Sequence, residues 1–258
     1  MPESVETIAT LRRRIAAVER IRPAAPELAP LGHDAIDAAL GGGLARARLH
    51  EIFAASGEDG GSAGGFAAML GCRLAGHGNI VWLREAAAER RGGCLHAPGL
   101  AELGLDPGRV VLGVLDDAES LLRIASDVVR CPDLALAVIE LWRAPRVLDL
   151  TASRRLAVAA EASGVTALML RAEAEPMPSA AHTRWSIASA AAAPLEAGAP
   201  GYPTLDVQLL RQRGGRAELG WRVEWDRDSK IFRDATLSGA ASALSGRQSV
   251  AAGERRAG

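Results

Sequence analysis

The segment LHEIFAASGEDGGSAGGFAAML, residues 49–70, decides the fold class of this chain. Its first residues predict a buried β-strand, the glycines predict a loop, and GFAAML predicts a helix. A strand, a glycine-rich loop and a helix in this order form the frame that surrounds phosphate in many nucleotide-hydrolysing proteins. The residues within the loop decide whether phosphate chemistry is present as well.

A working phosphate loop of the GxxxxGK[ST] type needs a lysine for the transferred phosphoryl group and a hydroxyl for magnesium. No residue from 55 to 65 is Lys or Arg, and the chain's only lysine, Lys230, lies far away in the sequence. Glu58 and Asp59 would each repel a phosphate charge about 4 Å away by about 1 kcal/mol in water. We interpret the segment as a degenerate loop that does not support efficient hydrolysis, while weak nucleotide binding through backbone amides stays open. Its glycines are Gly57, Gly60, Gly61, Gly64 and Gly65.

The same loop contains GxSxG, the nucleophile-elbow pattern of serine hydrolases, at residues 60–64. That elbow follows its strand directly, whereas the strand here is expected to end near Ala54. His96 and His182 are candidate triad partners, but no spacing singles one of them out. Hydrolase chemistry is therefore disfavoured.

Composition narrows the function classes further. The chain has 30 Lys and Arg against 31 Asp and Glu, so its overall field attracts neither nucleic acid nor an anionic membrane. Three cysteines without a CxxC pair indicate a reducing compartment, and the five histidines do not cluster as metal ligands. With no signal peptide or membrane-spanning stretch in the sequence, we expect a cytoplasmic protein without a metal or cofactor.

The pattern along the chain predicts three parts. Residues 1–30 form an N-terminal helix and a proline-rich linker, residues 31–236 form the core, and residues 237–258 form a disordered tail. Strands and helices alternate through the core, and the strands are almost continuously apolar. The predicted fold class is therefore α/β: a mostly parallel sheet covered by helices on both faces, with C-terminal antiparallel strands.

Two carboxylates are expected near the carboxyl edge of that sheet, where ligands commonly bind. Glu85 ends the strand NIVWLRE, and Glu140 lies in the strand LALAVIELW. Either could be a catalytic carboxylate beside a metal-bound nucleotide. Without the lysine, ion pairs with Arg84 or Arg143 are the favoured interpretation for both.

Two further groups are candidates for binding. Tryptophans interleaved with Arg184, Arg211 and Arg213 could contact single-stranded DNA, although a core in which Trp faces inward and Arg faces water explains the pattern better. The N-terminal helix carries an apolar stripe that could dock on a partner. This stripe consists of Ile8, Leu11 and Ile15.

Residues 31–173 resemble the RecA recombinase core, with Glu85 at the position of the catalytic glutamate and LALAVIELW at the Walker B strand. A closer resemblance is to the ImuA family, carried by LGGGLARARLHEIF, LDLTASRRLAVAAEASGVTALMLR, HTRWSIASA and LLRQRGGRAELGWRVEWD. The order and spacing of these segments carry the match, which covers most of residues 31–226.

The resemblance to ImuA implies an accessory role in SOS-induced, error-prone translesion DNA synthesis. The implied partners are an ImuB-like inactive Y-family polymerase homologue and an error-prone DnaE-type polymerase, with RecA as a further partner. Two alternatives stay open: a SulA-like inhibitor of cell division, which the long N-terminal part and LLRQRGG fit less well, and a RecA-type DNA-binding ATPase, which the missing lysine disfavours.

Overall fold

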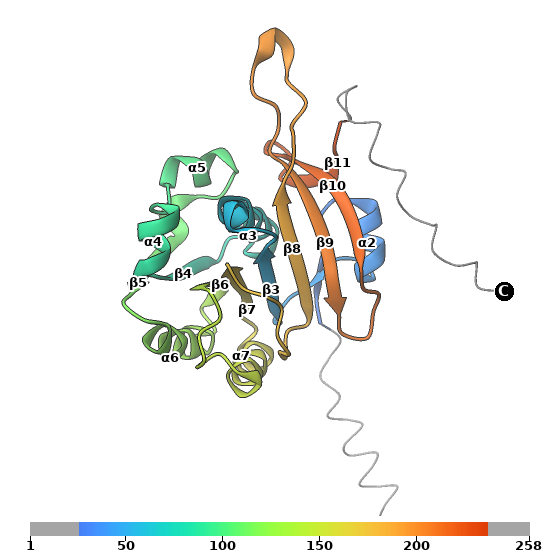
Figure 1. Cartoon of the computed structure of the whole chain (residues 1–258). Coiled ribbons are helices and arrows are strands. Elements are labelled where there is room, and N and C mark those ends of the chain that lie inside the picture. The colour runs from blue at the N-terminus through green and yellow to red at the C-terminus, as the bar shows by residue number, and fades with distance from the viewer. Residues whose placement is uncertain (1–25, 237–258) are drawn as a thin grey trace, which may run out of the picture.

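The structure is a computed structural model that describes residues 26–236. The predicted N-terminal helix, with Ile8, Leu11 and Ile15, and the predicted tail from 237 lie outside the described residues. The described part contains one large sheet, one small sheet and helices on both faces of the large sheet (Figure 1).

The large sheet has nine strands in the order β11-β10-β9-β8-β3-β7-β6-β4-β5. Their bounds are β3 (Leu49–Ala54), β4 (Asn79–Glu85), β5 (Val110–Leu115), β6 (Leu134–Trp142), β7 (Thr166–Ala172), β8 (Thr183–Ser189), β9 (Thr204–Gln212), β10 (Leu219–Asp226) and β11 (Ile231–Asp234). The small sheet pairs β1 (Leu28–Ala29) with β2 (Leu44–Ala45), so the last residues of the predicted linker pack against the core.

Strands β8, β3, β7, β6, β4 and β5 run parallel to one another, and β9, β10 and β11 continue the sheet in antiparallel pairs. The predicted fold class is confirmed. Central strands such as β3 and β7 are buried along their whole length, which is why they are apolar almost without interruption.

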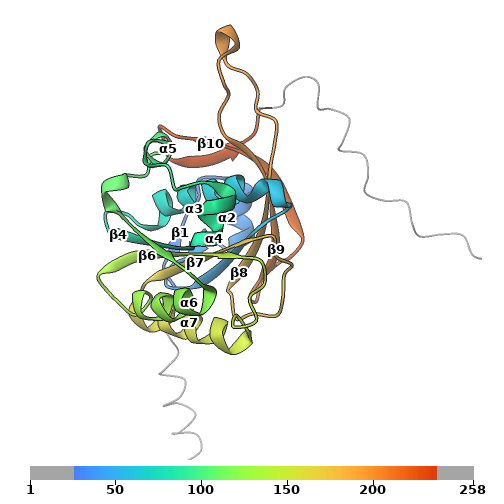
Figure 2. The same cartoon turned by 60° about the vertical axis from the view of Figure 1, so that its left-hand side comes forward.

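Six α-helices accompany the sheet within the described residues: α2 (Asp34–Leu40), α3 (Gly60–Leu74), α4 (Ala86–Gly92), α5 (Ala97–Glu102), α6 (Ala118–Val128) and α7 (Leu150–Ser163). In Figures 1 and 2, α3 lies on one face of the parallel strands, and α6 and α7 lie together on the other. Helix α2 ends for a reason that the local sequence provides: Gly41 follows it in the left-handed conformation, with φ of 79°. The sequence analysis did not predict α4, α5 or β11.

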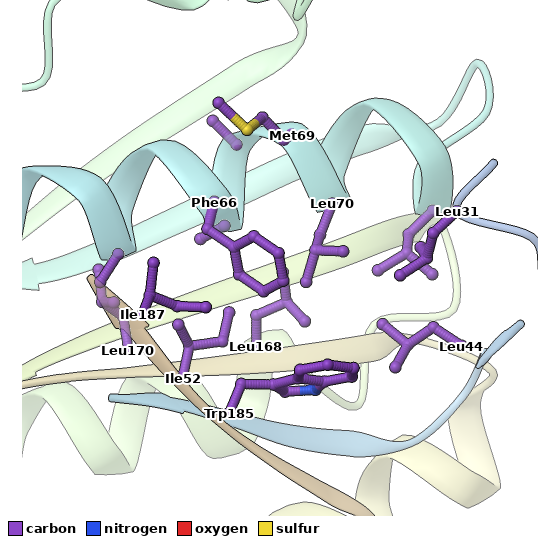
Figure 3. Close-up of a cluster of buried hydrophobic side chains, with 14 of the residues drawn as sticks. Leu31, Leu44, Ile52, Phe66, Met69, Leu70, Leu168, Leu170, Trp185 and Ile187 are labelled. Atoms are coloured by element: carbon purple, nitrogen blue, oxygen red, sulfur yellow. The ribbon is translucent and has the colours of Figure 1, made fainter. Parts of the chain in front are cut away.

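Each face of the sheet has its own core because side chains alternate along a strand. On β7, Leu168 and Leu170 point toward α3, and Ala167 and Met169 point toward α6 and α7. Figure 3 shows the first cluster, in which Phe66 of α3 lies among apolar side chains of the sheet. Burial of these apolar groups stabilises the fold without any ligand.

The two edges of the sheet differ in the side chains that they expose, and one long loop projects from the sheet. At the edge formed by β5, Val111, Leu112 and Val114 are exposed. At the other edge, β11 carries Arg233, which pairs with Glu224 of β10. The connection between β8 and β9, residues 190–203, projects well away from the sheet in both views (Figures 1 and 2).

Candidate functional site

Helix α3 begins earlier than the sequence predicted. The glycine-rich stretch was expected to be a loop up to residue 64, with the helix starting at Gly65, but a 3-10 turn at Gly57–Asp59 leads directly into α3 at Gly60. Glycine in a helix is less favourable than alanine by about 1 kcal/mol per residue, so the prediction followed local propensity and tertiary contacts overrode it. Four of the five loop glycines therefore lie on the first two turns of a helix: Gly60, Gly61, Gly64 and Gly65.

Asp59 is the residue immediately before this helix, and its side chain bonds to β8. Its carboxylate accepts hydrogen bonds from the backbone N and the Oγ of Ser189, at 2.8 and 3.0 Å, and from the Oγ of Ser56 at 2.7 Å. Burial works to raise the pKa of Asp59, but these hydrogen bonds together lower it below its ordinary value. The acid that was expected to repel a phosphate therefore joins the start of α3 to the end of β8.

A cavity of about 510 Å³ lies over the glycine face of α3. We call it the glycine cavity. Its walls are the glycine turns, the carboxyl ends of β4, β6 and β7, and the segment from Arg91 to Leu103. An added Cβ at Gly60, Gly61 or Gly65 would meet nothing within 4 Å. Packing within the described chain therefore does not require glycine at these three positions.

Glu140 lies in the wall of the glycine cavity and has both oxygens occupied. Oε1 accepts a hydrogen bond from Arg84 at 2.9 Å, and Oε2 accepts one from Trp82 Nε1 at 2.9 Å. Arg84 also donates to the carbonyl oxygen of Gly93 at 3.0 Å. The predicted ion pair between Glu140 and Arg84 is confirmed, and each oxygen of this carboxylate already accepts a hydrogen bond.

Glu85, at the end of β4, does not form the predicted ion pair. Its Oε1 accepts a hydrogen bond from the backbone N of Trp142 at 3.1 Å, and Arg143 pairs instead with Glu173 at 3.3 Å. Burial raises the pKa of Glu85, and the nearby Asp117 carboxylate acts in the same direction. Glu85 therefore holds the ends of β4 and β6 together through the main chain.

Arg91 is a cation of the cavity that the sequence analysis missed. It comes from α4, a helix that was not predicted. Its Nη1 lies 3.3 Å from Glu173 Oε2, and its guanidinium lies 5.4 Å from the centre of the Trp142 ring. The glycine-rich segment gives no signal for Arg91, because folding alone brings this distant residue to the cavity.

The other catalytic pattern in this segment finds no support. Ser62 is the third residue of α3 and does not stand on a strand-to-helix elbow. The side chains of His33, His50 and His96 form hydrogen bonds with residues other than Ser62. No group of three metal-ligating side chains occurs in residues 26–236.

The interleaved tryptophans and arginines follow the predicted core only in part. Trp185 and Trp225 are buried, as the core interpretation requires. Arg184 was expected to face water as a candidate for DNA contact, but it is buried and its Nε lies 2.8 Å from Glu51 Oε2. Arg211 and Arg213 are exposed, and their contact with DNA stays a prediction.

No helix within the described range is long and apolar enough to cross a membrane. The chain matches no protein-family model and no curated protein. Among solved structures it is similar to the crystal structure of the RadB recombinase, with a TM-score of 0.53 and 14% identity over 80% of this chain and 99% of that one. This likeness shows that the fold is RecA-like, and the finer resemblance to ImuA stays a prediction.

Proposed function

We propose that this chain is a non-catalytic RecA-like accessory protein that acts through protein contacts. The observation that carries the proposal is the start of α3. In a phosphate loop, the lysine and the magnesium-binding hydroxyl stand where the loop enters the helix. Here those first helical positions are Gly60 and Gly61, and the preceding Asp59 is bonded to Ser189.

The charged groups of the glycine cavity support the same proposal. Both oxygens of Glu140 accept hydrogen bonds within the chain, and Glu85, which lies outside the cavity lining, accepts one from the main chain. A magnesium ligand or a general base needs a carboxylate oxygen that can reach its target. The hydrogen bonds of Glu140 thus favour a structural role for this carboxylate.

The finer proposal rests on the resemblance to the ImuA family. We infer a role in damage-induced, error-prone translesion DNA synthesis in the cytoplasm, with an ImuB-like protein and an error-prone DnaE-type polymerase as partners. The segments that carry the resemblance correspond to elements of the core that include β3, α7 and β8–β10. No cofactor is part of this proposal.

Nucleotide turnover tests the non-catalytic part. The purified full chain, with millimolar ATP and Mg²⁺ and with or without single-stranded DNA, should release phosphate no faster than a buffer blank. Glu85→Gln is the matched variant, because it keeps an acceptor for the Trp142 N–H and removes the charge. Turnover by the natural chain that Glu85→Gln abolishes would show a RecA-type ATPase and overturn the proposal.

Co-purification tests the partners. A tagged full chain co-expressed with an ImuB-like protein from the same genome should retain it through gel filtration, and the DnaE-type polymerase should join the complex. If neither protein is retained while the ATPase test is negative, the finer proposal fails and the non-catalytic one stands.

A further inference from the structure

The outer surface of α6 and α7 forms a continuous groove. Three depressions of about 630, 530 and 330 Å³ follow these helices. The first shares Arg130 and Arg155 with the second, and Arg154 and Val158 with the third. Figures 1 and 2 show α6 and α7 side by side on the sheet face opposite α3, the helix that lines the glycine cavity. We call this surface the arginine groove.

The groove exposes one side of α7 while the other side packs on the sheet. Leu156 and Ala160 are buried in the core beneath the helix. Leu150 and Val158, two turns apart on the outside, are 54% and 57% exposed. Two exposed apolar side chains that line the same depression indicate a surface that gains from being covered.

The charges of the groove are unbalanced. Its arginines come from α6, α7 and the end of β9: Arg123, Arg130, Arg154, Arg155, Arg211 and Arg213. Only Arg130 forms an ion pair within residues 26–236, with Asp127 at 3.4 Å. Of the two other carboxylates that line the groove, Glu161 pairs with Arg48 at 3.5 Å, and Glu119 has no cation partner in the described part. Five arginines thus face one unpaired acid.

The side chains of the arginine groove favour an acidic helix over a nucleic acid as its ligand. No aromatic side chain lines any of the three depressions, so the groove offers no platform on which nucleic-acid bases could stack. Apolar side chains flanked by arginines instead match a helix that presents leucine-like residues between carboxylates. Helix α7 has 14 residues and is about 21 Å long, which allows a partner helix of similar length to lie along it.

The chain's own ends do not match this groove. Residues 1–25 contain five arginines and three glutamates, and residues 237–258 contain three arginines and one glutamate. Both segments are net basic and would be repelled. We propose that the arginine groove binds an acidic amphipathic helix of a partner protein. This inference does not rest on the proposed function, because it uses a surface on the opposite face of the sheet from the glycine cavity.

A designed peptide tests the inference on the full chain. The probe is a fluorescent three-heptad helix with leucine at the first and fourth positions of each heptad and glutamate at most others. We expect saturable binding by fluorescence anisotropy. Arg154→Glu with Arg155→Glu should weaken it about tenfold or more, since close opposite charges are replaced by like charges. Val158→Ser should weaken it without changing the net charge.

Arg90→Glu with Arg227→Glu is the matched control, because both arginines are exposed, lie outside the groove and give the same change in charge. Binding by this variant should stay within about twofold of the natural chain. Equal losses in the two double variants, or no binding by the natural chain, would overturn the proposal. So would tighter binding of an oligothymidylate that only the groove variant loses, since the groove would then be a nucleic-acid surface.

Discussion

The glycine cavity and the arginine groove both contain arginines, and they differ in what those arginines contact. Arg84 in the cavity wall is buried and holds Glu140 and the carbonyl oxygen of Gly93. Arg154 and Arg155 in the groove form no ion pair with any residue in 26–236. A buried charge persists only where the chain itself satisfies it, whereas an exposed arginine has water and can exchange it for a partner.

The largest expected effect comes from breaking the internal pair. Glu140→Ala leaves the buried Arg84 without its carboxylate and Trp82 without its acceptor. The free energy of unfolding should fall by about 3–5 kcal/mol, the usual result of removing one partner from a buried ion pair. Urea denaturation followed by circular dichroism measures it.

The double variant Arg84→Met with Glu140→Leu is the control for this loss. Removing both charges should recover part of the stability, because no unpaired charge is left buried, while the N–H of Trp82 still lacks its acceptor. A loss below about 1 kcal/mol in Glu140→Ala would show that the pair behaves like a surface pair, and the contrast with the groove would disappear.

The second effect is a pH dependence to which a buried histidine contributes. His50 is buried, with Nδ1 2.7 Å from Thr183 Oγ1 and Nε2 2.8 Å from the carbonyl oxygen of Ala45. Burial lowers the pKa of His50 from 6.5 to about 3. The unfolded chain therefore binds the extra proton between these values, and the free energy of unfolding falls by about 1.4 kcal/mol for each unit that the pH decreases.

Between pH 6.5 and 4.5 this amounts to a loss of up to about 3 kcal/mol. His50→Gln should flatten the dependence, measured by urea denaturation at several pH values. Burial also lowers the pKa of His182, which leaves part of the slope. His77→Asn, on the surface, should leave the slope unchanged. An unchanged slope in His50→Gln would show that another group titrates.

A smaller effect, of opposite sign, tests the glycines of the cavity. Gly65→Ala adds a methyl group to the second turn of α3, where it meets no atom of residues 26–236 within 4 Å outside its own helix. It should therefore raise the free energy of unfolding by about 0.5–1 kcal/mol. Gly43→Ala is the contrast: φ is 138°, and its Cβ would lie 2.5 Å from the carbonyl carbon of Ala29. Thermal melts should shift in opposite directions, and destabilisation by Gly65→Ala would contradict the open geometry.

The smallest effect is expected in the groove. Arg154→Glu with Arg155→Glu should change the free energy of unfolding by no more than about 0.5 kcal/mol, because neither side chain has an internal ion-pair partner to lose. The same denaturation assay measures it beside Glu140→Ala. A loss above about 2 kcal/mol would mean that these arginines maintain the structure, as Arg84 does.

Most of the parallel sheet was predictable because central strands such as β3 and β7 are fully buried and therefore almost continuously apolar. The start of α3 was not, because it depends on Asp59 bonding to Ser189, which lies 130 residues away. Arg184 was wrongly predicted to face water for a related reason. Alternation along a strand does not reveal that the neighbouring strand, β3, carries the buried Glu51 with which Arg184 pairs. Arg91 reaches the cavity through a short helix without a strong periodic pattern.

The place of β3 in the sheet has a consequence for synthesis on the ribosome. The first long strand to emerge lies between β7 and β8, and β8 ends at Ser189, 135 residues after the last residue of β3. At the usual 5–20 residues per second, β3 waits roughly 7–27 s for its second neighbour. During that time its unpaired edge is open to a chaperone or to another nascent chain, so slower translation of residues 55–189 should reduce the soluble yield.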